Sequence, residues 1–527
     1  MRAPISLGFD SYAWYSINFQ NTIDKWVDKD EAITSKKIIL NDILLHLEDL
    51  DLKDKKFEAK ICLFHQRFST NTLPRWHLAQ PFRLLAHNGE INAIRGNRNW
   101  AKARKSKFST ALIPEITRFK YLVNEKGSDS SALDNMIEIL VKGGINTFRA
   151  LRMVLPPAWQ NIHMMDPEIK SFHEYNSMHM EAWDGPAGIV MSDGRWAICL
   201  LDRNGLRPAR YQIDSEGYVT IASEIGVFPQ DESNFITKGR IGAGGIFAID
   251  TETGELIDQS IIDNKLKEGK PYRAWLRSKA KYLESSLYNY AGSGIKLISS
   301  IDLNRASKYF MLHTEERQSV IKPLAVDSSE GTGSMGDDTA LAVVSSMPRQ
   351  IYDFFRQQFA QVTNPPIDSL RESAVMSLET CFGPELNIFE ETPEHANRIV
   401  TSSPVLSHKK LNTLLKSKRF KSQEFKLLFS KSETLESALI KLGDKVKSAV
   451  KKGNVLIHLI EEMPEDNMLS INALLATGYI HQQLIIEGLR TDANIIISTA
   501  SARAVSYTHL RAHETRHDLV CRLLLEK

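Results

Sequence analysis

Short apolar runs alternate with turn residues through the first half of the chain, from residue 60 to about residue 250. Residues 188–205 and 209–224 each hold two such runs around a central Asp-Gly or Glu-Gly pair, and residues 244–250 add another. Alternation about a tight turn is typical of antiparallel hairpins. Apolar runs at 61–64 and 84–86 indicate two further strands. This half is therefore predicted to contain antiparallel sheets.

Helical periodicity separates these strands. Residues 130–142 and 148–154 place apolar side chains at helical spacing, so helices are expected to flank the sheets. Residues 263–327 are charged and helix-prone, with 274–290 as the clearest periodic piece, and predict a helical connector. The glycine-rich stretch 328–340 cannot form a helix interior and predicts a loop.

The second half shows a different pattern. Residues 350–363 predict a helix. Apolar runs at 454–462 and 493–499 are typical of buried parallel strands, and the helical stretch 470–487 lies between them. This order predicts an α/β unit.

Composition narrows the class of protein. The 527 residues allow two to four domains, and 66 Lys+Arg against 64 Asp+Glu leave a net charge of +2, which argues against nucleic-acid or acidic-membrane partners. Four scattered cysteines without CxxC pairs fit a reducing compartment. No signal-peptide core or membrane-length apolar run is visible, so a cytoplasmic protein is predicted.

The segment 65–100 carries the candidate chemistry. Arg67 follows the first apolar run, and Asn88 and Gly89 follow the second. A guanidinium can pair in bidentate fashion with the carboxylate of an amino acid. An Asn side-chain amide and a glycine N–H can stabilise the oxyanion that forms when an amide is attacked. These residues predict a glutamine-handling site.

The motifs RFSTNT (67–72), QPFRLLAHNGEIN (80–92) and RGNRNW (95–100) resemble the class II glutamine amidotransferase domain of the glutamate synthase large-subunit family. Further similarity lies in GSDSSALDN, EAWDGPAG, DRNGLRPARY and ASE, and MGDDTALAVVSSMPR, FAQVTNPPIDSLRE and MSLETCFGPE resemble the family's central domain. The resemblance extends to about Arg503.

This resemblance implies a fold and its domains. It implies a four-layer αββα domain of N-terminal-nucleophile hydrolase type, followed by an incomplete α/β central domain. The expected boundaries are an amidotransferase domain at 1–262, truncated at its N-terminus, the helical connector at 263–327, and the central domain at 328–503.

The resemblance also assigns roles to residues. Arg67 becomes the carboxylate clamp, Asp129 the partner of the substrate α-ammonium group, Asn88 and Gly89 the oxyanion hole, and Thr70 a substrate contact. Two structural alternatives stay open. Asp129 could cap the helix that begins near residue 130, and a Thr in a turn is more often structural.

In the complete enzyme the resemblance implies hydrolysis of glutamine and transfer of ammonia to 2-oxoglutarate, with reduction to glutamate by electrons from FMN and an iron-sulfur cluster. The electron donor would be a small partner subunit or ferredoxin. Neither the flavin barrel nor the cluster-binding cysteines are identified in this chain, so no cofactor is expected in it.

The family's nucleophile is an N-terminal Cys that uses its own α-amino group as base. Residue 1 here is Met, and the cysteines are Cys62, Cys199, Cys381 and Cys521. Cys62 is interpreted as core packing within a strand. The chain is therefore interpreted as an N-terminally truncated, inactive fragment. A non-catalytic glutamine- or glutamate-binding module and another class II amidotransferase are the alternatives, and the central-domain motifs argue against the second.

The last residues, 504–527, depart from the family pattern. HETRH (513–517) matches the HExxH zinc motif, but the remaining sequence leaves no room for a supporting domain, so no metal site is predicted. The tail resembles translated read-through of a sequencing adapter and is expected to be foreign to the fold.

Overall fold

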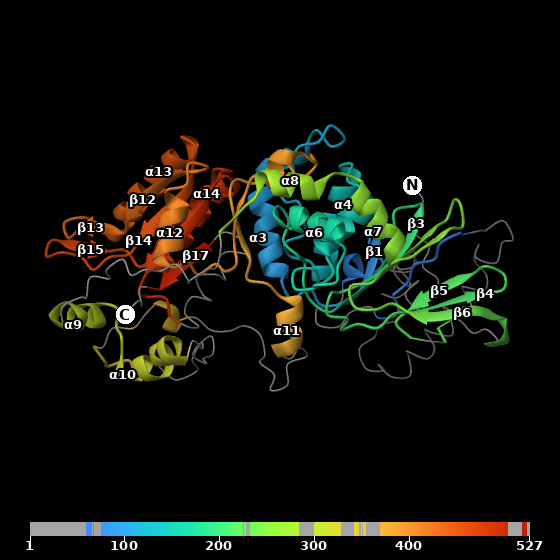
Figure 1. Ribbon diagram of the computed structural model, residues 1–527, viewed down its shortest axis with the longest axis horizontal. Helices are drawn as coiled ribbons and strands as arrows, with labels where there is room; N and C mark the ends of the chain where they lie inside the picture. The colour runs from blue at the N-terminus through green and yellow to red at the C-terminus, as the bar shows by residue number, and fades with distance from the viewer. Residues whose placement is uncertain are drawn as a thin grey trace, which may run out of the picture. The chain divides into compact units, whose positions relative to one another are not determined.

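The computed structural model describes residues 59–65, 67, 75–224, 226–227, 232–283, 300–327, 342–346, 349, 351–354, 369–503 and 519–523. The chain forms two compact units, and Figure 1 labels their main helices and strands. Unit 1 comprises Met1–Ile94, Val123–Pro157 and Trp183–Lys265, and unit 2 comprises Arg95–Leu122, Ala158–Ala182 and Leu266–Lys527. Both units thus draw on several separate stretches of sequence.

Unit 1 contains two antiparallel sheets. The five-stranded sheet has the order β1 (Leu85–Gly89), β2 (Ala187–Ser192), β3 (Trp196–Leu201), β7 (Ile246–Asp250) and β8 (Leu256–Ile257). The three-stranded sheet has the order β5 (Val219–Ala222), β4 (Arg210–Asp214) and β6 (Phe235–Arg240). The predicted β2–β3 and β4–β5 hairpins and the strand at 244–250 are confirmed.

The two sheets pack against each other through apolar side chains. Cys199 and Leu201 of β3 form a buried cluster with Ala209, with Ile221 of β5 packed beside them. This pairing follows from period-two alternation, which sends every second residue of β3 toward the other sheet.

Helices α4 (Asp129–Lys142) and α5 (Thr147–Val154) also belong to unit 1, where the sequence predicted helices. Contacts join both to the five-stranded sheet: His87 of β1 bonds Ser130 of α4, and Phe148 of α5 packs edge-on against Trp196 of β3. Helix, sheet and sheet are therefore stacked, which is the α+β arrangement that was predicted.

The predicted α/β unit is confirmed in unit 2. Strands β12 (Lys421–Lys426), β14 (Asn454–Ile460), β16 (Asn494–Thr499) and β17 (Leu519–Leu523) form a parallel sheet. Helices α13 (Leu435–Lys451) and α14 (Ala473–Ile486) share one buried core with this sheet. On its other face, Leu456 and Ile496 pack with Leu411 and Leu414 of α12 (His408–Leu415).

The remaining α-helices and β-strands of the described residues are α3 (Ile94–Arg104), α6 (Pro167–Ser177), α7 (Gln259–Glu268), α8 (Tyr272–Lys279), β9 (Lys281–Leu283), α9 (Ser300–Tyr309), α10 (Thr314–Glu316), α11 (Ser369–Val375), β10 (Thr380–Phe382), β11 (Ile399–Thr401), β13 (Leu428–Ser430) and β15 (Met468–Ser470).

A buried ionic network lies inside unit 2. Arg104, at the end of α3, donates from Nε to Glu385 at 2.6 Å and from Nη1 to Glu181, and all three residues are buried. Burial raises the pKa of the Glu181 carboxyl, although the guanidinium acts to lower it. The same burial acts to lower the pKa of Arg104, but the two carboxylates hold it above its usual value. The guanidinium thus bridges two buried carboxylates that repel each other.

Two predicted elements are wrong. Helix α8 ends at Lys279, and Lys281–Leu283 form β9, which pairs in parallel with β11. The helical interpretation of 274–290 therefore fails at residues 280–283, because the partner of β9 lies more than 100 residues away and leaves no mark on local periodicity. Residues 61–64 form no strand either.

Other predictions fall partly outside the described residues. Of the helix expected at 350–363, the structure describes Ile351–Phe354, a 3-10 turn. The loop at 328–340 and HETRH at 513–517 are not described. In the tail the described backbone of Leu519–Leu523 extends the parallel sheet. The foreign origin of the tail and the domain boundaries stay predictions.

Candidate functional site

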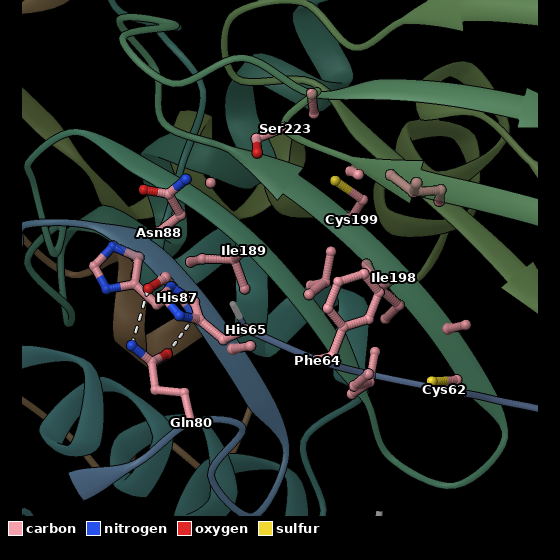
Figure 2. Close-up of a pocket in the computed structure, with 18 of the residues that line it drawn as sticks. Cys62, Phe64, His65, Gln80, His87, Asn88, Ile189, Ile198, Cys199 and Ser223 are labelled. Atoms are coloured by element: carbon pink, nitrogen blue, oxygen red, sulfur yellow. Dashed lines mark hydrogen bonds between the residues drawn. The ribbon is translucent and has the colours of Figure 1, made fainter. Parts of the chain in front are cut away.

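Unit 1 encloses a cavity of about 670 Å³ (Figure 2). Its walls come from residues 60–67, from β1, β2 and β3, and from residues 217–224 around β5. The volume falls within the roughly 300–1,000 Å³ of small-molecule sites.

Four of the five predicted site residues line this cavity: Arg67, Asn88, Gly89 and Asp129. They belong to three different segments of the chain, and the fold brings all three segments to the lining of one cavity. Thr70, the fifth, lies outside the described residues.

Asn88 and Gly89 are the last two residues of β1. Asn88 pairs with Gly188 of β2, and its side chain is exposed to the cavity. A Cβ atom at Gly89 would lie 1.8 Å from the carbonyl oxygen of Pro186, and its φ is +154°. The close passage of two backbones therefore requires glycine at this position.

β1 is an edge strand of its sheet, and side chains provide hydrogen-bond partners for the backbone groups along its outer edge. The Gln80 amide donates to the carbonyl of His87 at 3.1 Å and accepts from its N–H at 2.6 Å. The Asp134 carboxylate accepts from the N–H groups of Leu84 and Leu85 at 2.9 and 3.1 Å, and from that of Arg83 at 3.3 Å. Two side chains thus fix the strand that carries Asn88 and Gly89.

Asp129 is the first residue of α4, while Ser128 is the N-cap, because its side chain accepts from the N–H of Ser131. The proposed capping role of Asp129 is therefore filled by its neighbour. Asp129 Oδ2 accepts instead from the N–H of Ile91 at 2.7 Å, just beyond β1. Its side chain is 17% exposed, so the carboxylate remains open to the cavity. A helix N-terminus favours negative charge here.

His87 lies between these groups and was not identified from the sequence. Its side chain is fully buried, and Nδ1 is hydrogen-bonded to Ser130 Oγ at 2.7 Å. Burial lowers the pKa of His87 to about 4. The only sequence signal for this residue is its place in the apolar run LLAHNG (84–89). A histidine in such a run is more often packed in the core than part of a site.

Arg67 follows an extended segment without strand pairing. His65 Nδ1 accepts from the Arg67 N–H at 3.2 Å and lies 2.7 Å from its carbonyl oxygen. Cys62 is exposed and lines the cavity, so its interpretation as core packing is wrong. The apolar run indicated burial, but only Leu63 within it is buried, and the run finds no ladder partner among the described residues.

Asp202 organises the loop DRNGLRP. Its carboxylate accepts from the N–H groups of Ala187, Asn204 and Leu206 at 2.9 to 3.2 Å. This loop also carries Arg207, a second cation of the cavity wall, whose Nε has no hydrogen-bond partner among the described residues.

The described residues do not fit an iron-sulfur cluster, because they contain no group of three or more His, Cys, Asp or Glu side chains that could hold a metal. Among the described helices, none is long and apolar enough to cross a membrane.

Comparison with known proteins identifies both halves of the chain. Residues 31–275 match the family of class II glutamine amidotransferases, and residues 305–511 match the glutamate synthase central domain.

Relatives are similar over most of the chain. A ferredoxin-dependent chloroplastic glutamate synthase of Oryza sativa subsp. japonica is 39% identical over 86% of this chain and 28% of its own length. The large chain of an NADPH glutamate synthase of Bacillus subtilis is 36% identical over 87% of this chain and 30% of its own length, and an NADH glutamate synthase of Saccharomyces cerevisiae is 35% identical over 87% and 22%. The chain thus spans less than a third of the length of these relatives.

The amidotransferase half therefore has the fold of N-terminal-nucleophile hydrolases, and a glutamate synthase central domain follows it. The chain belongs to the glutamate synthase large-subunit family.

Proposed function

We propose that the cavity of unit 1 binds L-glutamine as the amidotransferase site of a glutamate synthase. The observation that supports this is the gathering of the Arg67 guanidinium, the Asp129 carboxylate, and the Asn88–Gly89 pair at the end of an edge strand, all on one cavity. An α-amino acid with a side-chain amide offers the complementary groups.

In this proposal each residue meets one part of the substrate. Arg67 pairs with the α-carboxylate and Asp129 with the α-ammonium group, and Thr70 adds a contact. Asn88 and Gly89 supply side-chain and backbone N–H donors to the oxyanion of the tetrahedral intermediate. The chain itself has Met at position 1 and Cys62 within an internal segment, so the 527-residue chain alone is proposed to bind glutamine without hydrolysing it.

For the complete protein we propose the reaction of its relatives: ammonia from glutamine is transferred to 2-oxoglutarate, and the product is reduced to glutamate. FMN and an iron-sulfur cluster would belong to parts outside this chain. The electron donor would be ferredoxin, or a pyridine nucleotide acting through a small partner subunit, since relatives of each kind are similar to this chain. A cytoplasmic location stays a prediction.

Calorimetry of the chain with L-glutamine tests the binding site. A charge-assisted hydrogen bond contributes roughly 1.5 to 3 kcal/mol, so Arg67→Ala should weaken binding by about tenfold or more, and Asp129→Asn should weaken it similarly. Arg83→Ala is the matched control, because Arg83 is exposed, pairs with Glu138 and does not line the cavity. Equal affinities of the Arg67 and Arg83 variants would overturn the clamp.

A further inference from the structure

The imidazole of His87 lies between the start of α4 and Gly89 of β1, and none of the roles proposed above explains it. The ring is fully buried, and the backbone N–H and carbonyl of His87 are both hydrogen-bonded to the side-chain amide of Gln80. The ring therefore points to a fixed place, on the side of β1 that meets α4.

One edge of the ring meets the start of α4. Nδ1 is hydrogen-bonded to Ser130 Oγ at 2.7 Å and lies 4.0 Å from Asp129 Oδ2. The same Asp129 oxygen accepts from the N–H of Ile91 at 2.7 Å. A shift of the ring would therefore also displace the start of α4 and with it the Asp129 carboxylate, which is proposed to bind the substrate ammonium group.

The other edge of the ring supports Gly89. A Cβ atom at Gly89 would lie 2.8 Å from His87 Nε2, so the ring fills the space beside this glycine. Nε2 is buried and forms no hydrogen bond of standard geometry with the described residues. It faces the place where the backbones of Gly89 and Pro186 cross, and the Pro186 carbonyl acts to raise the pKa of the ring.

The charge state of the ring matters because Asp129 is so close. Burial lowers the pKa of His87 to about 4. His65 and Arg207 act in the same direction, while Asp129 and the Pro186 carbonyl act to raise it. The ring is therefore neutral near pH 7. A cation here would pair with Asp129 and compete with the ammonium group of a bound amino acid.

We infer that His87 is a positioning residue: its buried imidazole holds Asp129 and the Asn88–Gly89 pair in a fixed relation, so that the Asp129 carboxylate faces the substrate ammonium group. The part concerning the substrate rests on the proposed function. The part concerning the protein does not, and the two can be tested separately.

Amide hydrogen exchange of the full chain tests the structural part without a ligand. His87→Ala should accelerate exchange about tenfold or more in residues 85–91 and in 128–134, because the variant loses both the hydrogen bond to Ser130 and the contact beside Gly89. His87→Asn, whose amide can replace Nδ1 beside Ser130, should restore protection at 128–134 more than at 85–91. His173→Ala, which removes a buried imidazole from unit 2, is the control and should leave both segments unchanged. Unchanged exchange in the His87→Ala chain would overturn the inference.

Calorimetry then tests the selectivity. The ligands are L-glutamine and 5-amino-5-oxopentanoic acid, which is the same molecule without the α-amino group. His87→Ala should weaken binding of L-glutamine about tenfold and of the second compound less than threefold, with partial recovery in His87→Asn. An equal loss for both ligands would overturn the positioning of Asp129. A parent chain that binds neither ligand would overturn the proposed function, while the exchange experiment still decides whether the ring holds the two segments.

Discussion

Asp134 should make the stability of β1 depend on pH, and Asp134→Asn should remove that dependence. The carboxylate is 1% exposed and accepts from three backbone N–H groups at the start of the strand. Burial raises its pKa to about 6, although the three donors act to lower it. The side chain is therefore a buried acid whose proton is held more tightly in the folded chain than in the unfolded chain.

The sign follows from this difference. With an unfolded pKa of about 3.9, the folded state binds more protons between about pH 4 and pH 6. The contribution of Asp134 to stability is therefore greatest below about pH 4, falls as the pH rises toward 6, and levels off above it. Two pH units at about 1.4 kcal/mol each give an upper limit of roughly 3 kcal/mol for the change. The Asn variant cannot ionise, so its stability relative to the parent should shift by up to this amount across the same interval.

Hydrogen exchange of residues 83–91 is the suitable assay, because a chain with two units need not unfold in one step. Parent and variant are compared at each pH, which cancels the intrinsic pH dependence of exchange. Glu138→Gln is the control on the same helix, since it removes a carboxylate that pairs with the exposed Arg83 and should change protection by less than about 1 kcal/mol. A constant difference between the parent and Asp134→Asn from pH 4.5 to 7 would refute the reasoning.

Two further predictions concern Gly89 and Cys62. Gly89→Ala should cost roughly 3 kcal/mol or more, measured as lost hydrogen-exchange protection in the five-stranded sheet, because backbone strain adds to the clash with Pro186. Gly194→Ala, with φ +104° and nothing within 4 Å of its Cβ, should cost only about 1 to 2 kcal/mol, and equal losses would contradict the steric argument. Glutamate release from glutamine by the 527-residue chain should remain at background, and Cys62→Ala should not change it; activity lost in that variant would identify Cys62 as a nucleophile.

The sequence revealed strands of two kinds: those whose pairing is local, and those long enough to form a continuous apolar run. Alternation of apolar and polar residues on both sides of Asp193-Gly194 predicts the β2–β3 hairpin. Long apolar runs predict the parallel strands β14 and β16. The pairing of β9 with β11 joins residues that are far apart in sequence, and three residues are too few to carry a period of their own. Segment 61–64 shows the converse, since an apolar run indicates burial but cannot supply a hydrogen-bonding partner.

The candidate site divides in the same way. Arg67, Asn88 and Gly89 lie within contiguous motifs and could be named from them. His87, Gln80 and Asp134 act through contacts that only the fold creates, such as the bond from Leu84 to a carboxylate 50 residues later in the chain. Polar side chains that satisfy an edge strand have no sequence spacing that distinguishes them from ordinary surface residues.

The network of Arg104, Glu181 and Glu385 bears on how this protein could have been assembled in evolution. Glu181 lies in the sequence of the amidotransferase family and Glu385 in that of the central domain, yet one buried guanidinium holds both. Recombination near residue 290 would separate Glu385 from Arg104 and Glu181, and an incoming module without an arginine at this position would leave Glu385 buried without its guanidinium, a loss of several kcal/mol. A chimera of distant relatives is therefore expected to fold only when it retains the arginine and both glutamates.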